Sequence, residues 1–137
     1  MKVSQFALPL VTLAGLAMGS PAIAAPPASA VGVWNLLTDR GYATLDIGAQ
    51  GGAGAPGASE CRHINGKVGI ADVRGWYCPS SGRIHFLHYN YSTNVPVRTF
   101  TGAVSVDANG AMHMAGTVTV LAIAFGDLGE QPFSANR

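Results

Sequence analysis

Hydrophobic and polar residues alternate along most of this chain in short runs, which is typical of strands with one buried and one exposed face. In residues 42–47, Tyr, Thr and Asp alternate with Ala, Leu and Ile. In residues 97–106, Phe100, Val104 and Val106 share one face, while threonines and a serine share the other. The pattern predicts strands throughout and no helix.

Turn signals separate these runs at regular intervals. Asn65-Gly66 predicts a two-residue hairpin turn, because both central positions of a type I′ turn need positive φ. The spacing predicts an all-β fold, an antiparallel up-and-down barrel of seven or eight strands, with a β-sandwich as the alternative. In residues 83–91, one face carries Ile84, Phe86 and His88 and the other carries Arg83, His85, Leu87 and Tyr89. Both faces are mixed, so we expect an inward face that is partly polar. The predicted strands cover residues 31–37, 42–47, 73–78, 83–91, 97–106, 111–124 and 132–135, and the short segments 62–64 and 67–70 flank the predicted Asn65-Gly66 turn.

The first 24 residues predict a signal peptide that is removed on export. Lys2 supplies the positive end, residues 6–18 are apolar, and Ala22-Ile23-Ala24 is a small-x-small cleavage site. Ala28-Ser29-Ala30 is a second candidate site. The apolar run is too short for a transmembrane helix, and no later segment is long enough. We therefore expect a secreted or periplasmic protein without a membrane span.

The mature chain is predicted to hold one domain. Removing residues 1–24 leaves 113 of the 137 residues, with a short flexible lead at 25–30 and a single barrel domain at 31–137. Residues 48–59 contain five glycines and four alanines and predict a mobile surface loop, with a lid over a site as the alternative. Of the eight Lys and Arg residues Lys2 leaves with the signal, and the remaining seven balance seven Asp and Glu. This balance argues against nucleic acid as a partner.

Cys61 and Cys78 are the only cysteines. In an oxidising compartment they are expected to form a disulfide, worth about 3 kcal/mol for so short a loop. The alternative is a metal or redox site, but the spacing is not the CxxC of redox motifs.

No constellation of residues predicts catalysis. His85 and His88 fall on opposite faces of one predicted strand, so they do not form a two-histidine metal site, although convergence of His63 and His113 stays open. Most carboxylates lie at predicted turns, and the chain has no HExxH, Gly-x-Ser-x-Gly or phosphate-binding loop. We expect no enzyme activity, no cofactor and no metal.

The layout resembles the avidin family within the lipocalin-like (calycin) barrels. The resemblance rests on the opening Gly32-Val33-Trp34-Asn35, the strand at 82–91, Thr99-Phe100-Thr101-Gly102 with the turn at 107–110 and its long return strand, and the ending Phe133-Ser134. It implies an eight-stranded barrel with a ligand pocket at one mouth, and it is compatible with a homo-oligomer. The family's return strand supplies a key tryptophan to the biotin site; residues 114–121 contain none, so the aromatic box is incomplete.

Taken together, these features predict an exported, non-enzymatic protein that binds a small, largely apolar ligand in the barrel mouth. The residues expected near the ligand are Asn35, Trp76, Tyr89 and Thr101. The alternative is a structural or protein-interaction module at the cell surface or in the periplasm, whose outer face makes the contacts. A metal-binding or catalytic protein that uses the histidines is a third alternative.

Overall fold

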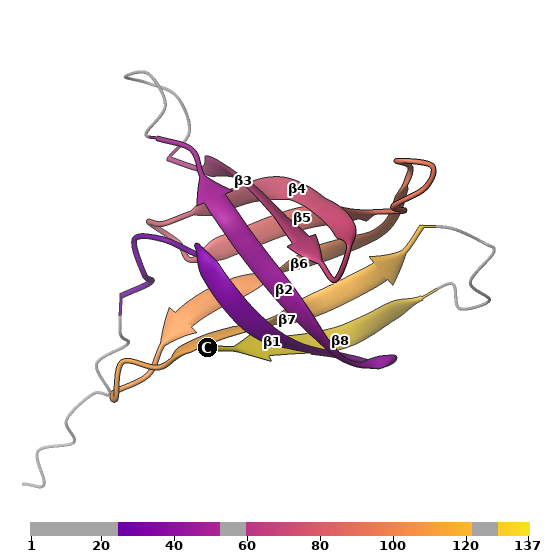
Figure 1. Ribbon diagram of the computed structural model, residues 1–137. Coiled ribbons are helices and arrows are strands. Elements are labelled where there is room, and N and C mark those ends of the chain that lie inside the picture. The colour runs from indigo at the N-terminus through magenta and orange to yellow at the C-terminus, as the bar shows by residue number, and fades with distance from the viewer. Residues whose placement is uncertain (1–24, 53–59, 122–128) are drawn as a thin grey trace, which may run out of the picture.

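The computed structural model describes residues 25–52, 60–121 and 129–137, and within these ranges it contains eight strands and no helix (Figure 1). No helix that could cross a membrane is therefore present in these ranges. The predicted signal peptide, residues 1–24, lies outside the described residues. The strands are β1 (Gly32–Thr38), β2 (Gly41–Gln50), β3 (Arg62–Val68), β4 (Ala71–Cys78), β5 (Arg83–Tyr89), β6 (Pro96–Val106), β7 (Met112–Val120) and β8 (Glu130–Asn136).

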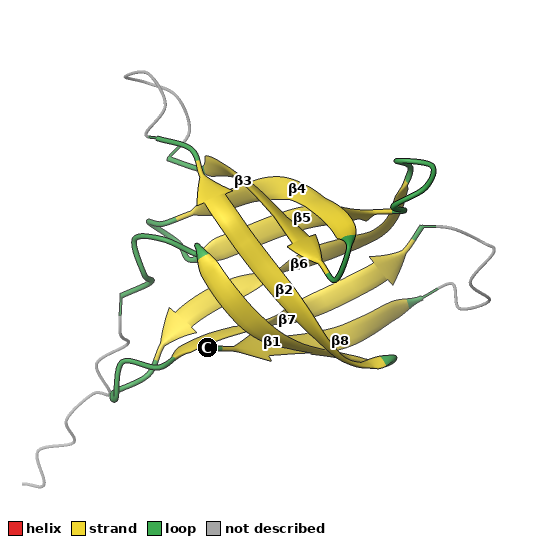
Figure 2. Ribbon diagram, in the orientation of Figure 1, coloured by secondary structure: helices red, strands yellow, loops and turns green. Residues whose placement is uncertain are grey.

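The strands form one closed antiparallel barrel in which each strand pairs with its neighbours in the sequence (Figure 2). The barrel closes where β8 returns to β1, with Asn35 opposite Asn136 and Leu37 opposite Ser134. The predicted up-and-down barrel is confirmed with eight strands, and the sandwich alternative is wrong. Closure leaves no strand edge unpaired.

Alternating side chains from every strand fill the barrel interior. Trp34 and Tyr77 are fully buried, and Phe86 stacks on Phe100 with ring centroids 4.6 Å apart. Phe133 meets Phe100 edge-on at 5.2 Å, a favoured aromatic geometry. An eight-stranded barrel is just wide enough for side chains to fill it. The interior is therefore a packed core.

Several inward positions are glycines because the neighbouring strand lies too close for a side chain. Gly102 and Gly116 face each other across β6 and β7, and a Cβ on Gly116 would lie 2.1 Å from the carbonyl oxygen of Thr101. Gly66 is similar, since its Cβ would lie 2.0 Å from the carbonyl oxygen of Asp46. Such glycines allow a strand to bend and approach its neighbour closely.

The predicted turn at Asn65-Gly66 is wrong. Both residues lie inside β3, and the chain turns four residues later, between Val68 and Ala71. Gly69 has a φ of 61°, so it supplies the positive φ that the turn requires. Gly66 is needed instead for the close approach of β2 to β3.

Residues 25–30 pack over one end of the barrel, which we call the covered end. The Trp34 Nε1–H donates to the carbonyl of Ala30 at 3.0 Å, and the Tyr77 hydroxyl donates to the carbonyl of Pro27. The Gln50 side chain donates to the carbonyl of Ala28 and accepts from the amide of Ala30. The segment predicted as a flexible lead therefore has fixed partners in the structure.

The disulfide between Cys61 and Cys78 is present, as the sequence predicts, and lies near the covered end. It ties the chain just before β3 to the last residue of β4. Of the glycine-rich stretch at 48–59, residues 48–50 belong to β2, and residues 53–59 lie outside the described residues.

Candidate functional site on the outer barrel face

The four residues predicted to line a ligand pocket lie on the outside of the barrel. Asn35 alternates with the buried Trp34 and Leu36, so its side chain points outward. Trp76 and Thr101 likewise flank buried residues, and Trp76 is 36% exposed. Tyr89 is half-buried, and its ring contacts the exposed Arg74, which places it on the outer side as well.

Three of these four residues share one outer surface, which spans β3 to β6. Directly opposite one another across these strands lie His63, Trp76, His85 and Thr101, a set that we call the aromatic row. The rings of Trp76 and His85 stack with centroids 5.2 Å apart, and His85 Nδ1 hydrogen-bonds to Thr101 Oγ1 at 3.0 Å. These contacts fix the orientation of Trp76 at the surface.

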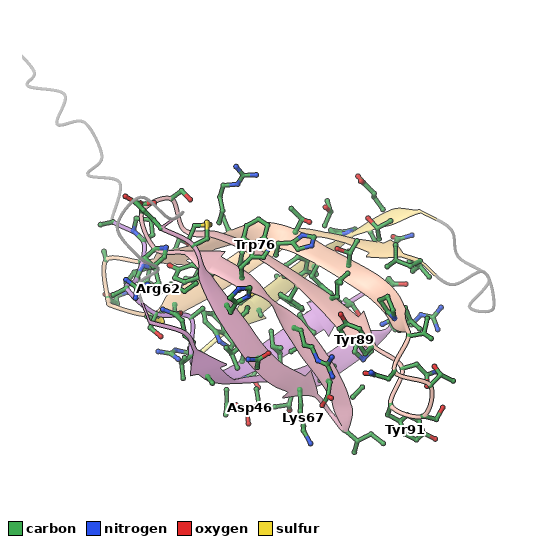
Figure 3. All side chains as sticks on the ribbon, turned by 90° about the horizontal axis from the view of Figure 1, so that it is seen from above. Asp46, Arg62, Lys67, Trp76, Tyr89 and Tyr91 are labelled. Carbon is green, nitrogen blue, oxygen red and sulfur yellow. A yellow bond between two sulfur atoms is a disulfide. The ribbon has the colours of Figure 1, made fainter. Side chains whose placement is uncertain are left out.

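Tyr89 lies beside the aromatic row and is held by Arg74. The guanidinium of Arg74 lies 4.9 Å from the centre of the Tyr89 ring, a cation–π contact. The same guanidinium contacts Asp72 Oδ2 and Asn94 Oδ1, each at 3.4 Å. Figure 3 shows Trp76 and Tyr89 on the face that also carries Asp46 and Lys67.

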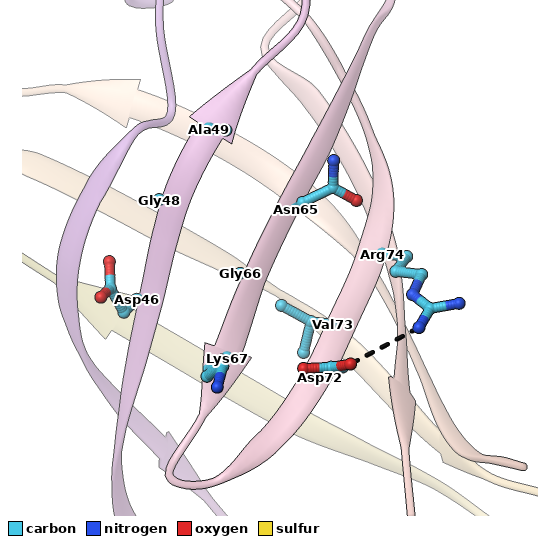
Figure 4. Close-up of a pocket in the computed structure, with 9 residues that line it drawn as sticks. All are labelled: Asp46, Gly48, Ala49, Asn65, Gly66, Lys67, Asp72, Val73 and Arg74. Atoms are coloured by element: carbon cyan, nitrogen blue, oxygen red, sulfur yellow. Dashed lines mark hydrogen bonds and ion pairs between the residues drawn. The ribbon is translucent and has the colours of Figure 1, made fainter. Parts of the chain in front are cut away.

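A groove of about 410 Å³ adjoins this surface over β2, β3 and β4 (Figure 4). Gly48 and Ala49 on β2 contribute little or no side chain to its wall. The pairing of β2 with β3 also shifts register between Ile47 and Ala49, which marks a bulge. Two carboxylates and two cations border the groove, so it offers both signs of charge to a partner. The lining residues are Asp46, Gly48, Ala49, Asn65, Gly66, Lys67, Asp72, Val73 and Arg74.

Asn35 does not belong to this surface. It lines a separate cleft of about 300 Å³ over β1, β7 and β8, together with Tyr42, His113 and Asn136. His113 Nε2 lies 3.3 Å from Asp107 Oδ2. Hydrogen bonds from His113 and from two backbone amides lower the pKa of Asp107 below its usual value.

The four histidines do not gather at one point. His63 and His85 lie in the aromatic row on either side of Trp76, His88 points into the barrel, and His113 lies in the Asn35 cleft. No group of three or more His, Cys, Asp or Glu side chains that could hold a metal ion exists in the described parts of the chain.

Sequence reasoning grouped Trp76, Tyr89 and Thr101, which the structure places on one outer surface, but it missed the residues that contact them. Arg74 belongs to no sequence motif, so its contact with Tyr89 was not predicted. His85 was considered as a metal ligand, so its stacking on Trp76 was not predicted either. The period-two pattern of the sequence could have indicated the outward faces of Arg74, Trp76 and His85, because each of these residues is next to a buried core residue.

No family model matches this chain, and no curated protein or solved structure resembles it significantly. The closed eight-stranded barrel is compatible with the calycin-like layout that the sequence suggests.

Proposed function

We propose that this protein is an exported, non-enzymatic interaction module that binds a partner protein through its outer face over β3 to β6. The observation that supports this proposal is the clustering of Trp76, Tyr89 and Arg74 on that face. Tryptophan, tyrosine and arginine are the residues that most often dominate the binding energy of protein interfaces.

The packed interior favours this proposal over a ligand held deep inside the barrel. Trp34, Tyr77, Phe86 and Phe100 are at most 1% exposed, so an internal ligand would have to displace core side chains. Displacing these side chains is costly, since each large buried aromatic ring contributes roughly 3–5 kcal/mol to the free energy of unfolding.

The contacts of Arg74 prepare this face for binding. Its guanidinium is already oriented by Asp72, Asn94 and the Tyr89 ring, so less side-chain freedom is lost when a partner binds. The charged groups of the groove then give specificity, because a partner must match the positions of Lys67 and Asp46.

Site-specific photocrosslinking in the native compartment tests the proposal. A photoreactive p-benzoylphenylalanine at position 76 is expected to crosslink to one discrete protein. The matched control carries the same group at position 33, where Val33 is exposed on β1, away from the aromatic row. Adding Arg74→Ala to the position-76 probe should weaken the crosslink.

Two outcomes would contradict the proposal. One is equal crosslinking from positions 76 and 33, which would mean non-specific contact. The other is the absence of any crosslinked protein at position 76 while the barrel is folded. A crosslinked product of two identical chains would identify the partner as a second copy.

A further inference from the structure

A line of exposed polar side chains crosses the outside of the barrel, from β2 through β1, β8 and β7 to β6. The strand pairing places Asn35 opposite Asn136, and Asn136 opposite His113. Thr44 and Ser105 continue the line on either side, and all five side chains are exposed. We call this set the polar row. Neighbouring strands lie about 4.8 Å apart, so adjacent members of the row can contact one small ligand together.

The middle of the polar row lines the cleft of about 300 Å³ over β1, β7 and β8. The next outward positions along the same strands are Leu37, Ser134 and Ala115, which also line the cleft. Tyr42 lies opposite Leu37 and is 85% exposed, so its ring is open to a ligand. The cleft therefore combines hydrogen-bonding groups with an aromatic ring and an aliphatic side chain.

The polar groups of the cleft are available to a ligand. Within the described parts of the chain, the side chains of Asn35, Asn136 and Ser134 make no hydrogen bond. Each carboxamide offers two donor hydrogens and an acceptor oxygen, and the serine hydroxyl donates and accepts. His113 Nε2 is bonded to Asp107, so Nδ1 is the ring nitrogen left for a ligand.

The chemistry of the cleft matches a neutral ligand that carries several hydroxyl groups. Among the described residues that line it, none is Lys, Arg, Asp or Glu, so it offers no fixed charge to an anion or a cation. A carboxamide can donate to one hydroxyl and accept from the next one on the same ring. A sugar ring also has an apolar C–H face, which suits the negative face of an aromatic ring such as Tyr42.

We propose that this cleft binds a neutral saccharide of one or two rings. Asn35 and Asn136 hydrogen-bond to its hydroxyls, and Tyr42 contacts the C–H face of a ring. The volume is at the lower end of the range for small-molecule sites, which sets the limit of two rings. The cleft lies over β1, β7 and β8, whereas the face proposed to bind a protein lies over β3 to β6, so either proposal can fail without the other.

The test is an NMR titration of the ¹⁵N-labelled protein, purified from a host that exports it. The probes are the methyl glycosides of glucose, galactose, mannose and N-acetylglucosamine, each added separately. The side-chain amide signals of Asn35 and Asn136 are assigned by their loss in Asn35→Ala and Asn136→Ala. We expect at least one glycoside to shift both sets of signals until they saturate. Glycerol has hydroxyls without a ring, and cyclohexanol has a ring with a single hydroxyl, so both should bind more weakly.

Variants of the cleft test the assigned contacts. Asn35→Ala and Asn136→Ala should each weaken binding of that glycoside by roughly three- to tenfold, since a neutral hydrogen bond is lost. Tyr42→Ala should weaken it by about tenfold, because the ring contact is lost. The matched control is Tyr91→Ala, since Tyr91 is also highly exposed but lies in the connection between β5 and β6. It should bind like the wild type.

Three results would overturn the proposal. The first is that no glycoside shifts the side-chain amide signals of Asn35 and Asn136. The second is that adenosine, added as a further probe, binds more tightly than every glycoside, which would make the cleft a site for a planar base. The third is that Tyr42→Ala and Tyr91→Ala have equal affinities, which would remove Tyr42 from the site.

Discussion

Replacing Tyr77 by phenylalanine removes the hydroxyl that joins the barrel to the segment over its covered end. The ring stays in the core, so packing is preserved, and only the hydrogen bond to the Pro27 carbonyl is lost. Pro27 is itself buried, so its carbonyl would be left without a partner. Leaving a buried polar group unsatisfied costs about 1–3 kcal/mol.

For a domain of this size, each 1 kcal/mol corresponds to a shift of roughly 4 °C in Tm. Tyr77→Phe should therefore lower Tm by about 4–12 °C in a calorimetric scan. Amide hydrogen exchange at Ala30, whose N–H is bonded to Gln50 Oε1, should accelerate as the segment loosens. Tyr42→Phe is the control, because Tyr42 is 85% exposed and should change Tm by less than about 2 °C.

The reasoning would be refuted if both variants had the same Tm, or if exchange at Ala30 were unchanged in Tyr77→Phe. Either result would mean that residues 25–30 do not depend on Tyr77 for their position. Burial raises the pKa of the Tyr77 hydroxyl, so the hydrogen bond should persist through neutral and mildly alkaline pH.

Phe100→Ala removes a ring that contacts two others in the core. It should lower the free energy of unfolding in urea by about 3–5 kcal/mol. The control is Leu37→Ala on the outer face, which should lower it by less than about 1 kcal/mol. Equal costs would contradict the packed interior. Replacing Cys61 and Cys78 together by serine should cost about 2–5 kcal/mol, and reduction of the wild type should reproduce that loss. The pKa of Asp107 is lowered in the folded state, so its contribution to stability is present above its ordinary value of 3.8 and is lost as the pH falls through the folded pKa. Asp107→Asn should flatten the pH dependence of the free energy of unfolding in that acidic window, and an unchanged slope would argue against the His113 contact.

The strand pattern could be predicted from the sequence because it depends on neighbours in the chain. Buried and exposed positions alternate in β1 and in the first part of β5, and the disulfide follows from having only two cysteines. The period also placed His88 on the same face as Phe86, although it did not show which face is inward.

The turn at Asn65-Gly66 could not be excluded from the sequence, because its cause lies in another strand. An Asn-Gly pair is suited to a tight turn on local grounds. Here, however, glycine is needed at position 66 because the backbone of Asp46 on β2 lies too close for a side chain. The true turn uses Gly69, whose local signal is weaker. A contact between strands thus outweighed a local preference.

The position of Trp76 shows a second limit. A large aromatic residue suggests a core or a pocket floor, yet its neighbour Tyr77 occupies the interior and Trp76 is turned outward. Two adjacent aromatic residues on a strand cannot both face the core. Which one does so depends on the closure of the whole barrel, which a single run of residues does not encode.

The contacts of residues 25–30 connect the proposed removal of a signal peptide to the stability of the barrel. Cleavage after Ala24 would leave Pro27 and Ala30 in place as acceptors for Tyr77 and Trp34. Cleavage after Ala30 would remove the segment and expose both aromatic residues to solvent. Under the proposed export, the position of the cut would determine whether one end of the core is sealed, and the first residue of the exported form would then affect its stability.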